Sequence, residues 1–338
     1  MQYFGNYIKI NIFELNKNKL GITICNLDLD FEINFNQINE IIKELCDNFT
    51  IEQIDGIENN KIISSNITLI CNIKNYILNE NIIDPENNYL YYLNNKSKEI
   101  TINLFNKYKI IILTIIGLMI KQIIELKYNI HFITHISKVK NIQDIIPNNN
   151  LQYHKLLYLQ QEQIPIYDPR AKILIEKEIK KAINNNLPIS GSLETLIFNV
   201  PKGLGNPFFN SFEAKLSELL FLVPNLKGLE FANVININSN LSSPFKTIKF
   251  ENDELIYHSN YYYGIEEGIT TGDIISFTTH YLPPLVYKNT KSINYKTLEN
   301  IIIEKNSEII NFYKNIKIIE ALSSIVIYDF IKRKVINE

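Results

Sequence analysis

Histidine has the widest chemical range of any residue type in this chain, and five are present. His131 and His135 stand four apart in the segment 130–137, whose alternation of apolar and polar residues predicts a β-strand. A strand places both imidazoles on one face, but about 13 Å apart, which is too far to share a metal ion. We therefore interpret them as two imidazoles on a sheet surface.

The remaining histidines and the cysteines predict no metal centre. Three histidines have no cysteine or acidic residue at ligand spacing: His154, His258 and His280. The three cysteines are Cys25, Cys46 and Cys71. Their odd number and the lack of a Cys-x-x-Cys spacing argue against a disulfide framework or a zinc site. We expect a reducing, cytoplasmic environment.

Two glycine-bearing segments stand out locally. The first, Pro-Lys-Gly-Leu-Gly-Asn-Pro at 201–207, precedes a predicted helix whose N-terminal amides could face an anion. The favoured alternative is a purely structural turn between a strand and that helix. The second segment, 263–273, spaces glycines four residues apart, which permits close backbone approach to a planar ligand or a neighbouring chain. No Gly-x-Ser-x-Gly elbow, Walker loop or dinucleotide-binding glycine motif is present.

Composition excludes several classes of protein. The 338 residues carry 34 Lys+Arg and 36 Asp+Glu, so no sequence-wide basic field favours nucleic acid or an anionic membrane. The longest apolar run, 110–120, is too short to span a bilayer, and the N-terminal residues lack the apolar core of a signal peptide. Arg170 and Arg333 are the only arginines, so lysine must hold phosphates as a point charge.

Hydrophobic periodicity predicts strands and helices in mixed order. Strands are expected at 7–13, 20–27, 61–73, 130–137, 189–200, 226–232 and 273–281, with a hairpin at 246–257. Helices are expected at 36–46 (capped by Asn36), 106–127, 169–183 (capped by Asp168), 211–222 and 318–332. Residues 79–98, 138–163 and 261–272 are expected to be connections. This order predicts an α+β fold, and with no dividing linker we expect one domain over residues 1–338.

The glycine segments and their neighbours carry a family resemblance. Residues 200–207 read Val-Pro-Lys-Gly-Leu-Gly-Asn-Pro, and a helix and Lys227-Gly228-Leu229-Glu230 follow. The stretch 260–273 and Pro283 come next, and Ile319-Glu320-Ala321 opens the last helix. In this order the segments resemble chorismate synthase, most strongly over 165–283.

The resemblance implies a fold, a reaction and an assembly. The fold has a helical layer sandwiched between antiparallel β-sheets, and the assembly is a homotetramer. The family converts 5-enolpyruvylshikimate 3-phosphate to chorismate by anti-1,4-elimination of phosphate, and it requires reduced FMN. Two histidines tune protonation, and arginines hold the phosphates and carboxylates. The flavin-binding positions carried over are Asn225, Gly268, Pro283, Pro284 and Leu285, and Gly268 and Pro283 are expected to line the flavin cavity.

The chain departs from the family where chemistry would occur. The family histidines are replaced near Lys17 and Asn87, and the flavin loop aligns with 101–109, which has no glycine, serine or arginine. An arginine-histidine-aspartate triplet aligns with 306–308, so Glu308 is the candidate to replace the aspartate. Lys314 lies near a family arginine and is the candidate for one phosphate charge. Other lysines that could replace lost charges are Lys17, Lys107 and Lys109.

Three hypotheses follow. The chain is a diverged chorismate synthase, because the hydrophobic periodicity persists over the full length. Alternatively, it is a catalytically impaired homologue that keeps the fold and the oligomer contacts as a scaffold or partner subunit, because the family histidines and flavin loop are missing. A third hypothesis is an unrelated α+β binding protein, for which the ordered motifs would be chance.

Overall fold

The computed structural model forms two compact units. It describes residues 2–16, 18–74, 82–83, 105–147, 151–185, 187–231, 246–251, 254–259, 264–283, 289–294, 297, 299–304 and 312–337. Unit 1 comprises Met1–Ile116 and Leu285–Ile310, and unit 2 comprises Gly117–Pro284 and Asn311–Glu338. The boundary falls within helix α3, Phe105–Tyr128. A single domain over residues 1–338 stays a prediction.

Unit 1 is built on an antiparallel sheet with strand order β1-β2-β3-β7-β4. These strands are β1 Gln2–Phe4, β2 Lys9–Asn16, β3 Lys19–Cys25, β4 Phe49–Asp55 and β7 Ile67–Ile73. The first two predicted strands are confirmed. Helix α1, Phe35–Leu45, is also confirmed, but its cap is wrong: the side chain of Asn34, not Asn36, accepts from the amide of Gln37 at 3.1 Å. Three apolar side chains of α1 are buried: Phe35, Ile38 and Ile42.

Short strands complete the described part of unit 1. Strands β5 Ile57–Glu58 and β6 Lys61–Ile62 form a hairpin. Strands β8 Ile82–Ile83, β18 Asn289–Asn294 and β19 Glu299–Glu304 form an antiparallel sheet. The predicted connection 79–98 lies outside the described residues except for β8.

Unit 2 contains an antiparallel sheet with strand order β10-β9-β11-β17-β12. Its strands are β9 His131–Val139, β10 Ile142–Gln143, β11 Gly191–Phe198, β12 Leu226–Phe231 and β17 Ile275–Tyr281. The four predicted strands of this sheet are confirmed. Two further hairpins are β13 Lys246–Glu251 with β14 Glu254–Ser259, as predicted, and β15 Ile265–Glu266 with β16 Ile269–Thr270, in a stretch that we expected to be a connection.

The register gives the unit 2 sheet one largely apolar face and one face that mixes polar and apolar side chains. His135 lies opposite Glu194, and Ser192 lies opposite His280, so these polar side chains share a face. The alternate positions are buried and mostly apolar, including Phe132, Leu193, Ile197 and Phe277. The mixed face carries the histidines and carboxylates of this sheet.

Helices pack on this sheet. They are α4 Tyr153–Leu156, η2 Leu157–Gln161, α5 Pro169–Asn184, α6 Phe212–Leu220, η4 Phe312–Asn315 and α7 Ile316–Asn337. Asp168 caps α5 by accepting from the amide of Arg170 at 2.9 Å, as predicted. The expected connection 138–163 is partly wrong, because α4 and η2 bury Leu156 and Leu159 against the sheet residue Ile133.

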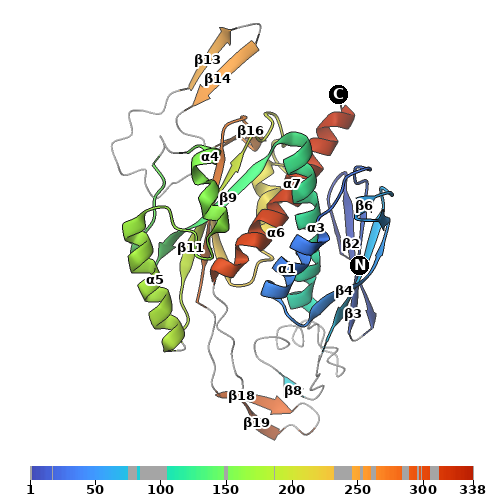
Figure 1. The fold of residues 1–338 in the computed structure, drawn as a ribbon, viewed down its shortest axis with the longest axis vertical. Helices are drawn as coiled ribbons and strands as arrows, with labels where there is room; N and C mark the ends of the chain where they lie inside the picture. Colours follow the sequence, from blue (N-terminus) through green and yellow to red (C-terminus); the bar gives the residue numbers. More distant parts are fainter. Residues whose placement is uncertain are drawn as a thin grey trace. The chain divides into compact units, whose positions relative to one another are not determined.

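Helix α7 is the centre of the helical packing in unit 2. Figure 1 shows it beside α6, where the Phe212 and Phe330 rings are 5.5 Å apart. Gly117 of α3 touches α7, because a Cβ there would lie 2.4 Å from the Ala321 carbonyl oxygen. The α+β fold is confirmed. Among the described helices, none combines the length and hydropathy that crossing a bilayer requires.

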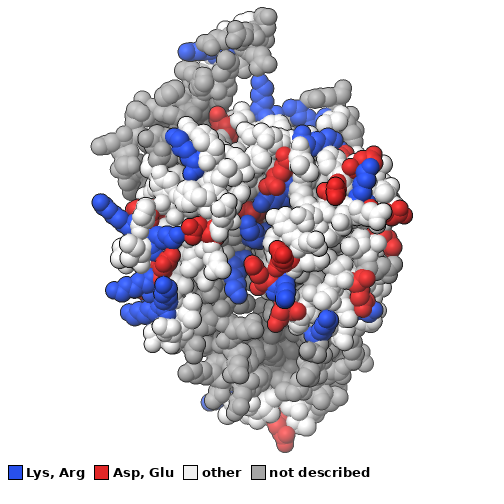
Figure 2. Space-filling model, in the orientation of Figure 1, with Lys and Arg blue, Asp and Glu red and all other residues white. Residues whose placement is uncertain are grey.

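Charge is mixed on the surface. On the face drawn in Figure 2, Lys and Arg side chains are interspersed with Asp and Glu. Interspersed charges produce no extended field of one sign on that face, which agrees with the near-neutral composition.

Candidate functional site

Two predicted flavin-binding residues meet at one end of the unit 2 sheet. Asn225 has a left-handed backbone (φ 62°), and its carbonyl oxygen accepts from the amide of Leu282 at 3.0 Å. This bond places Asn225 beside Pro283, whose side chain is exposed at the end of β17. The pairing joins segments about sixty residues apart.

Lys314 belongs to the same end of the sheet. It lies on η4, and its side chain is exposed. The neighbouring ring of Phe312 packs against Tyr281 at 5.8 Å, one residue before Leu282. The ring also fills the space over Gly191, where a Cβ would lie 2.2 Å from it. We call this region the β17 end: the C-terminal end of β17, where Asn225 lies beside Pro283, with the adjoining η4, which carries Lys314.

The other predicted residues divide into two groups. Outside the described residues lie Lys17, Asn87, Glu308, Pro284 and Leu285. Gly268 is described, but it lies in the turn of the β15–β16 hairpin, which comes before β17, while Pro283 follows the strand. Seven strand residues separate the two turns by about 20 Å. The structure does not bring Gly268 to the β17 end, and its place in the flavin cavity stays a prediction.

The two glycine segments instead interlock with each other. The amide of Gly203 donates to the Thr270 carbonyl at 2.7 Å, and the Thr270 amide donates to the Leu204 carbonyl at 2.8 Å. The carbonyl of Gly268 accepts from the amide of Phe212, the first residue of α6, at 2.9 Å. Ser211 accepts from another amide of that first turn. The geometry therefore supports the structural alternative for the turn 201–207 over an anion site.

Gly205 lies at a point between the two glycine segments that leaves no space for a side chain. Its φ is 109°, and a Cβ would lie 2.1 Å from the Gly268 carbonyl oxygen. We expect Gly205→Ala to lower the free energy of unfolding by about 1–3 kcal/mol through overpacking, measured by urea denaturation. Gly272→Ala is the matched control, because its φ is similar (93°) but its nearest neighbour is 3.4 Å away. Equal losses in both variants would contradict the steric account.

The hydrogen-bond partners of His280 could not be predicted from spacing in the sequence. Its Nδ1 lies 2.8 Å from the Ser192 hydroxyl, and its Nε2 lies 3.3 Å from the Glu230 carboxylate. Both contacts come from neighbouring strands, because β17 pairs with β11 on one side and β12 on the other. Gly228 makes room for the imidazole, since a Cβ there would lie 3.1 Å from its ring.

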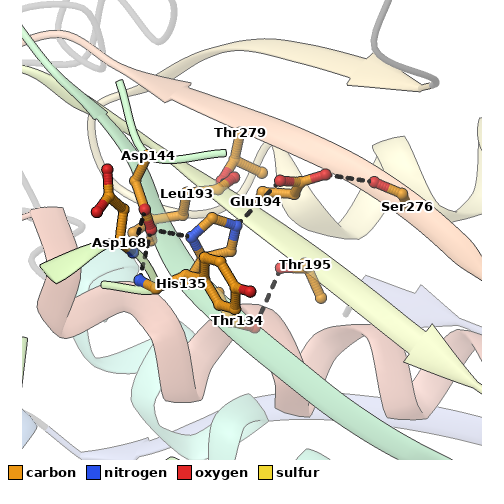
Figure 3. A network of polar contacts seen from close by, with 10 residues as sticks. Thr134, His135, Asp144, Asp168, Leu193, Glu194, Thr195, Ser276 and Thr279 are labelled. Atoms are coloured by element: carbon orange, nitrogen blue, oxygen red, sulfur yellow. Dashed lines mark hydrogen bonds and ion pairs between the residues drawn. The ribbon is translucent and has the colours of Figure 1, made fainter. Parts of the chain in front are cut away.

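The expectation that His135 lies on the sheet surface is wrong. Its side chain is fully buried between Asp144, 2.8 Å from Nδ1, and Glu194, 2.9 Å from Nε2 (Figure 3). Burial alone would lower the pKa of His135, but the hydrogen bonds that its ring donates to Asp144 and Glu194 raise it to about 9. His135 is therefore an imidazolium at neutral pH, held by two carboxylates.

The His135 network ties the sheet to α5. Asp144 also accepts from the backbone amides of Tyr167 and Asp168, at 2.7 and 2.8 Å, directly before α5 begins. Glu194 also accepts from the Ser276 hydroxyl at 2.9 Å, which continues the network onto β17. Because His135 and Asp144 at its centre are fully enclosed, this network is a structural support for the sheet.

His131 is half-buried on the same strand. Its ring stacks on Tyr153 with centroids 4.2 Å apart. Burial, followed by the Lys121 charge, lowers the pKa of His131. The shared face of His131 and His135 agrees with the predicted strand, and among the described residues no group of three or more His, Cys, Asp or Glu could hold a metal.

Comparisons with known proteins point to one family. The family model described as chorismate synthase matches residues 109–331. Chorismate synthase of Methanococcus vannielii is 28% identical over 229 residues, covering 63% of this chain and 60% of that protein. That of Methanocaldococcus jannaschii is 31% identical over 199 residues, covering 56% and 53%. These alignments thus span little more than half the length of the curated relatives.

A solved structure shares the fold. The structure described as the crystal structure of chorismate synthase superimposes with a TM-score of 0.73 and 15% sequence identity. It covers 98% of this chain and 93% of the other.

Proposed function

Because the chain belongs to the chorismate synthase family, we propose that it converts 5-enolpyruvylshikimate 3-phosphate to chorismate. The reaction is an anti-1,4-elimination of phosphate, a lyase step of the shikimate pathway and of aromatic amino acid biosynthesis. The observation that supports the proposal is that Asn225 lies beside Pro283 at the β17 end, where η4, the element that carries Lys314, packs through Phe312. These residues were selected from separate motifs, and an unrelated fold would have no reason to bring them together.

The β17 end has groups suited to reduced FMN. An exposed ammonium at Lys314 can pair with a phosphate, and the exposed ring of Pro283 offers an apolar surface. Reduced FMN would supply a transient electron to the substrate when bound. Asn225, Pro283 and Lys314 would hold the flavin and substrate, and Lys314 would neutralise part of their negative charge.

Further assignments belong to the same proposal. Glu308 would replace the family aspartate, and Pro284 and Leu285, which follow Pro283, would complete the flavin site. The protein would act as a cytoplasmic homotetramer. Because the family histidines are replaced near Lys17 and Asn87, other groups would have to transfer the protons of the reaction.

A catalytically impaired homologue is the second candidate. The replacement of the family histidines favours it, because removing an acid–base histidine typically costs a factor of about 10²–10⁴ in rate. Such a protein would retain the fold and the oligomer contacts as a scaffold or partner subunit.

Complementation separates these candidates. The chain would be expressed in a bacterium that lacks its own chorismate synthase, on medium without aromatic compounds. Growth is expected if the protein produces chorismate. No growth, with folded protein present in the cells, favours the impaired homologue.

Lys314 provides a test of the site itself. We expect Lys314→Met to weaken binding of 5-enolpyruvylshikimate 3-phosphate by about 10–100-fold, since a charge-assisted contact contributes about 1.5–3 kcal/mol. Calorimetry would measure the dissociation constant. Lys155→Met, an exposed lysine on α4, is the control and should bind as the parent protein does. Equal affinity in all three proteins would remove Lys314 from the site.

A further inference from the structure

Gly191 leaves a notch in the largely apolar face of the unit 2 sheet. It pairs with Tyr281 across β11 and β17, so the two positions share one face. Because glycine has no side chain, space remains beside the Tyr281 ring, and the Phe312 ring fills it. The centroids of the two rings lie 5.8 Å apart, and a Cβ on Gly191 would lie 2.2 Å from the Phe312 ring. We call this space the Gly191 notch.

The notch fixes η4 on the N-terminal side of Lys314. Phe312, two residues before the lysine, is 3% exposed, and Asn315, one residue after it, is 5% exposed. The Lys314 side chain between these buried residues is exposed. On the other side, α7 begins at Ile316 directly after η4. The backbone that carries the Lys314 ammonium is therefore held from both directions.

Tyr281 connects this anchor to the rest of the β17 end. The next residue, Leu282, donates its amide hydrogen to the Asn225 carbonyl at 3.0 Å. The contact between the Tyr281 and Phe312 rings therefore joins the end of β17 to the element that carries Lys314. A change at Phe312 would loosen that connection without removing any group that could meet a ligand.

We propose that Phe312, seated in the Gly191 notch, is a positioning residue that holds Lys314 where its ammonium meets a phosphate of the bound ligand. The inference rests on the proposed function, because it needs a phosphate-bearing ligand at the β17 end. Phe312 itself is buried and acts only through Lys314. A lysine contributes a point charge on a flexible stem, so the position of its backbone decides whether the charge is within reach of the phosphate.

Because Phe312 acts through Lys314, the two residues should not contribute independently to binding. Phe312→Leu keeps an apolar side chain but no longer fills the notch, so η4 can shift. We expect this variant to bind 5-enolpyruvylshikimate 3-phosphate about 3–10-fold more weakly than the parent protein does. When Lys314 is already methionine, the same change should alter the dissociation constant by less than about two-fold.

Phe277→Leu is the matched control. Phe277 is buried on the same face of β17 as Tyr281, and its ring packs against Phe231 with centroids 6.0 Å apart. Its replacement should lower the free energy of unfolding, as Phe312→Leu does, because both changes leave space in a packed interior. The affinity for the ligand should nevertheless equal that of the parent protein. Equal losses of affinity in Phe277→Leu and Phe312→Leu would overturn the inference.

Calorimetry on the parent, the single variants and Phe312→Leu/Lys314→Met completes the test. An unchanged affinity in Phe312→Leu, or an equal loss with and without Lys314, would also overturn the inference. If Phe312→Leu does not fold, Phe312→Met takes its place with the same outcomes, because an unbranched thioether adapts to irregular space. If the parent binds neither this ligand nor reduced FMN, the proposed function fails and the inference fails with it. If the parent binds but the two residues are independent, only the inference fails.

Discussion

Replacing His135 with glutamine should lower the free energy of unfolding by about 3–5 kcal/mol. The imidazolium lies between Asp144 and Glu194, and the side chains of His135 and Asp144 are fully enclosed. Glutamine can replace a hydrogen bond but not the positive charge, so two carboxylates would face each other without compensation. Urea denaturation followed by circular dichroism would measure the loss.

The matched control for His135→Gln is His131→Gln. Both residues lie on β9 with their side chains on the same face, but His131 is only half-buried and bonds to Asn129 at 2.7 Å. We expect His131→Gln to change stability by less than about 1 kcal/mol. A similar loss in the two variants would show that the ion pairs of His135 are unimportant.

The same network predicts sensitivity to alkali. The pKa of His135 is raised from 6.5 to about 9, so the folded state binds its proton more tightly than the unfolded state does. The resulting stabilisation, roughly 3 kcal/mol, is fully present below pH 6.5 and is lost as the pH rises through about 9. Thermal unfolding between pH 6 and 10 should show this loss in the parent protein and not in His135→Gln.

The second large effect is expected at Lys121. Its ammonium lies 2.8 Å from the Glu320 carboxylate, and the side chains are 13% and 2% exposed. Burial would raise the pKa of Glu320, but the Lys121 charge holds it below its usual value. In Lys121→Met, Glu320 would have to remain charged without this partner or take up a proton, at a cost of about 3–5 kcal/mol in unfolding free energy.

Lys317→Met is the control for Lys121→Met. Lys317 lies 3.7 Å from the same Glu320 carboxylate, but its side chain is 35% exposed. Water screens such a pair, so the expected loss is below about 1 kcal/mol. Chemical denaturation of the two variants under identical conditions tests the comparison. A larger loss for Lys317→Met would contradict the assignment of Lys121 as the principal partner.

Local pattern sufficed to predict much of unit 2. Alternation identified β9, and the Asp168-Pro169 pair identified the start of α5. Helix α3 could be predicted because apolar residues cover all sides of its middle part. The failures occurred where little local signal exists: α4 and η2 bury only Leu156 and Leu159 within a polar stretch.

The polar networks required the register of the sheet. Glu194 lies 59 residues from His135, and Glu230 lies 50 residues from His280, so no local spacing indicates either pair. Likewise, the order of the motifs suggested residues for a flavin site. Only the hydrogen bond between Leu282 and Asn225 shows that Asn225 lies beside Pro283, whereas Gly268 lies elsewhere. The sequence shows which residue types are present, but which side chains contact each other depends on which strands lie side by side.

The central claim is best tested by one anaerobic titration. Purified protein would receive reduced FMN and then 5-enolpyruvylshikimate 3-phosphate, while flavin absorbance and chorismate are followed together. We predict saturable flavin binding and chorismate release, with lysine side chains serving in place of the missing family arginines. A folded protein that binds no flavin at millimolar concentration and releases no chorismate would contradict the proposed function.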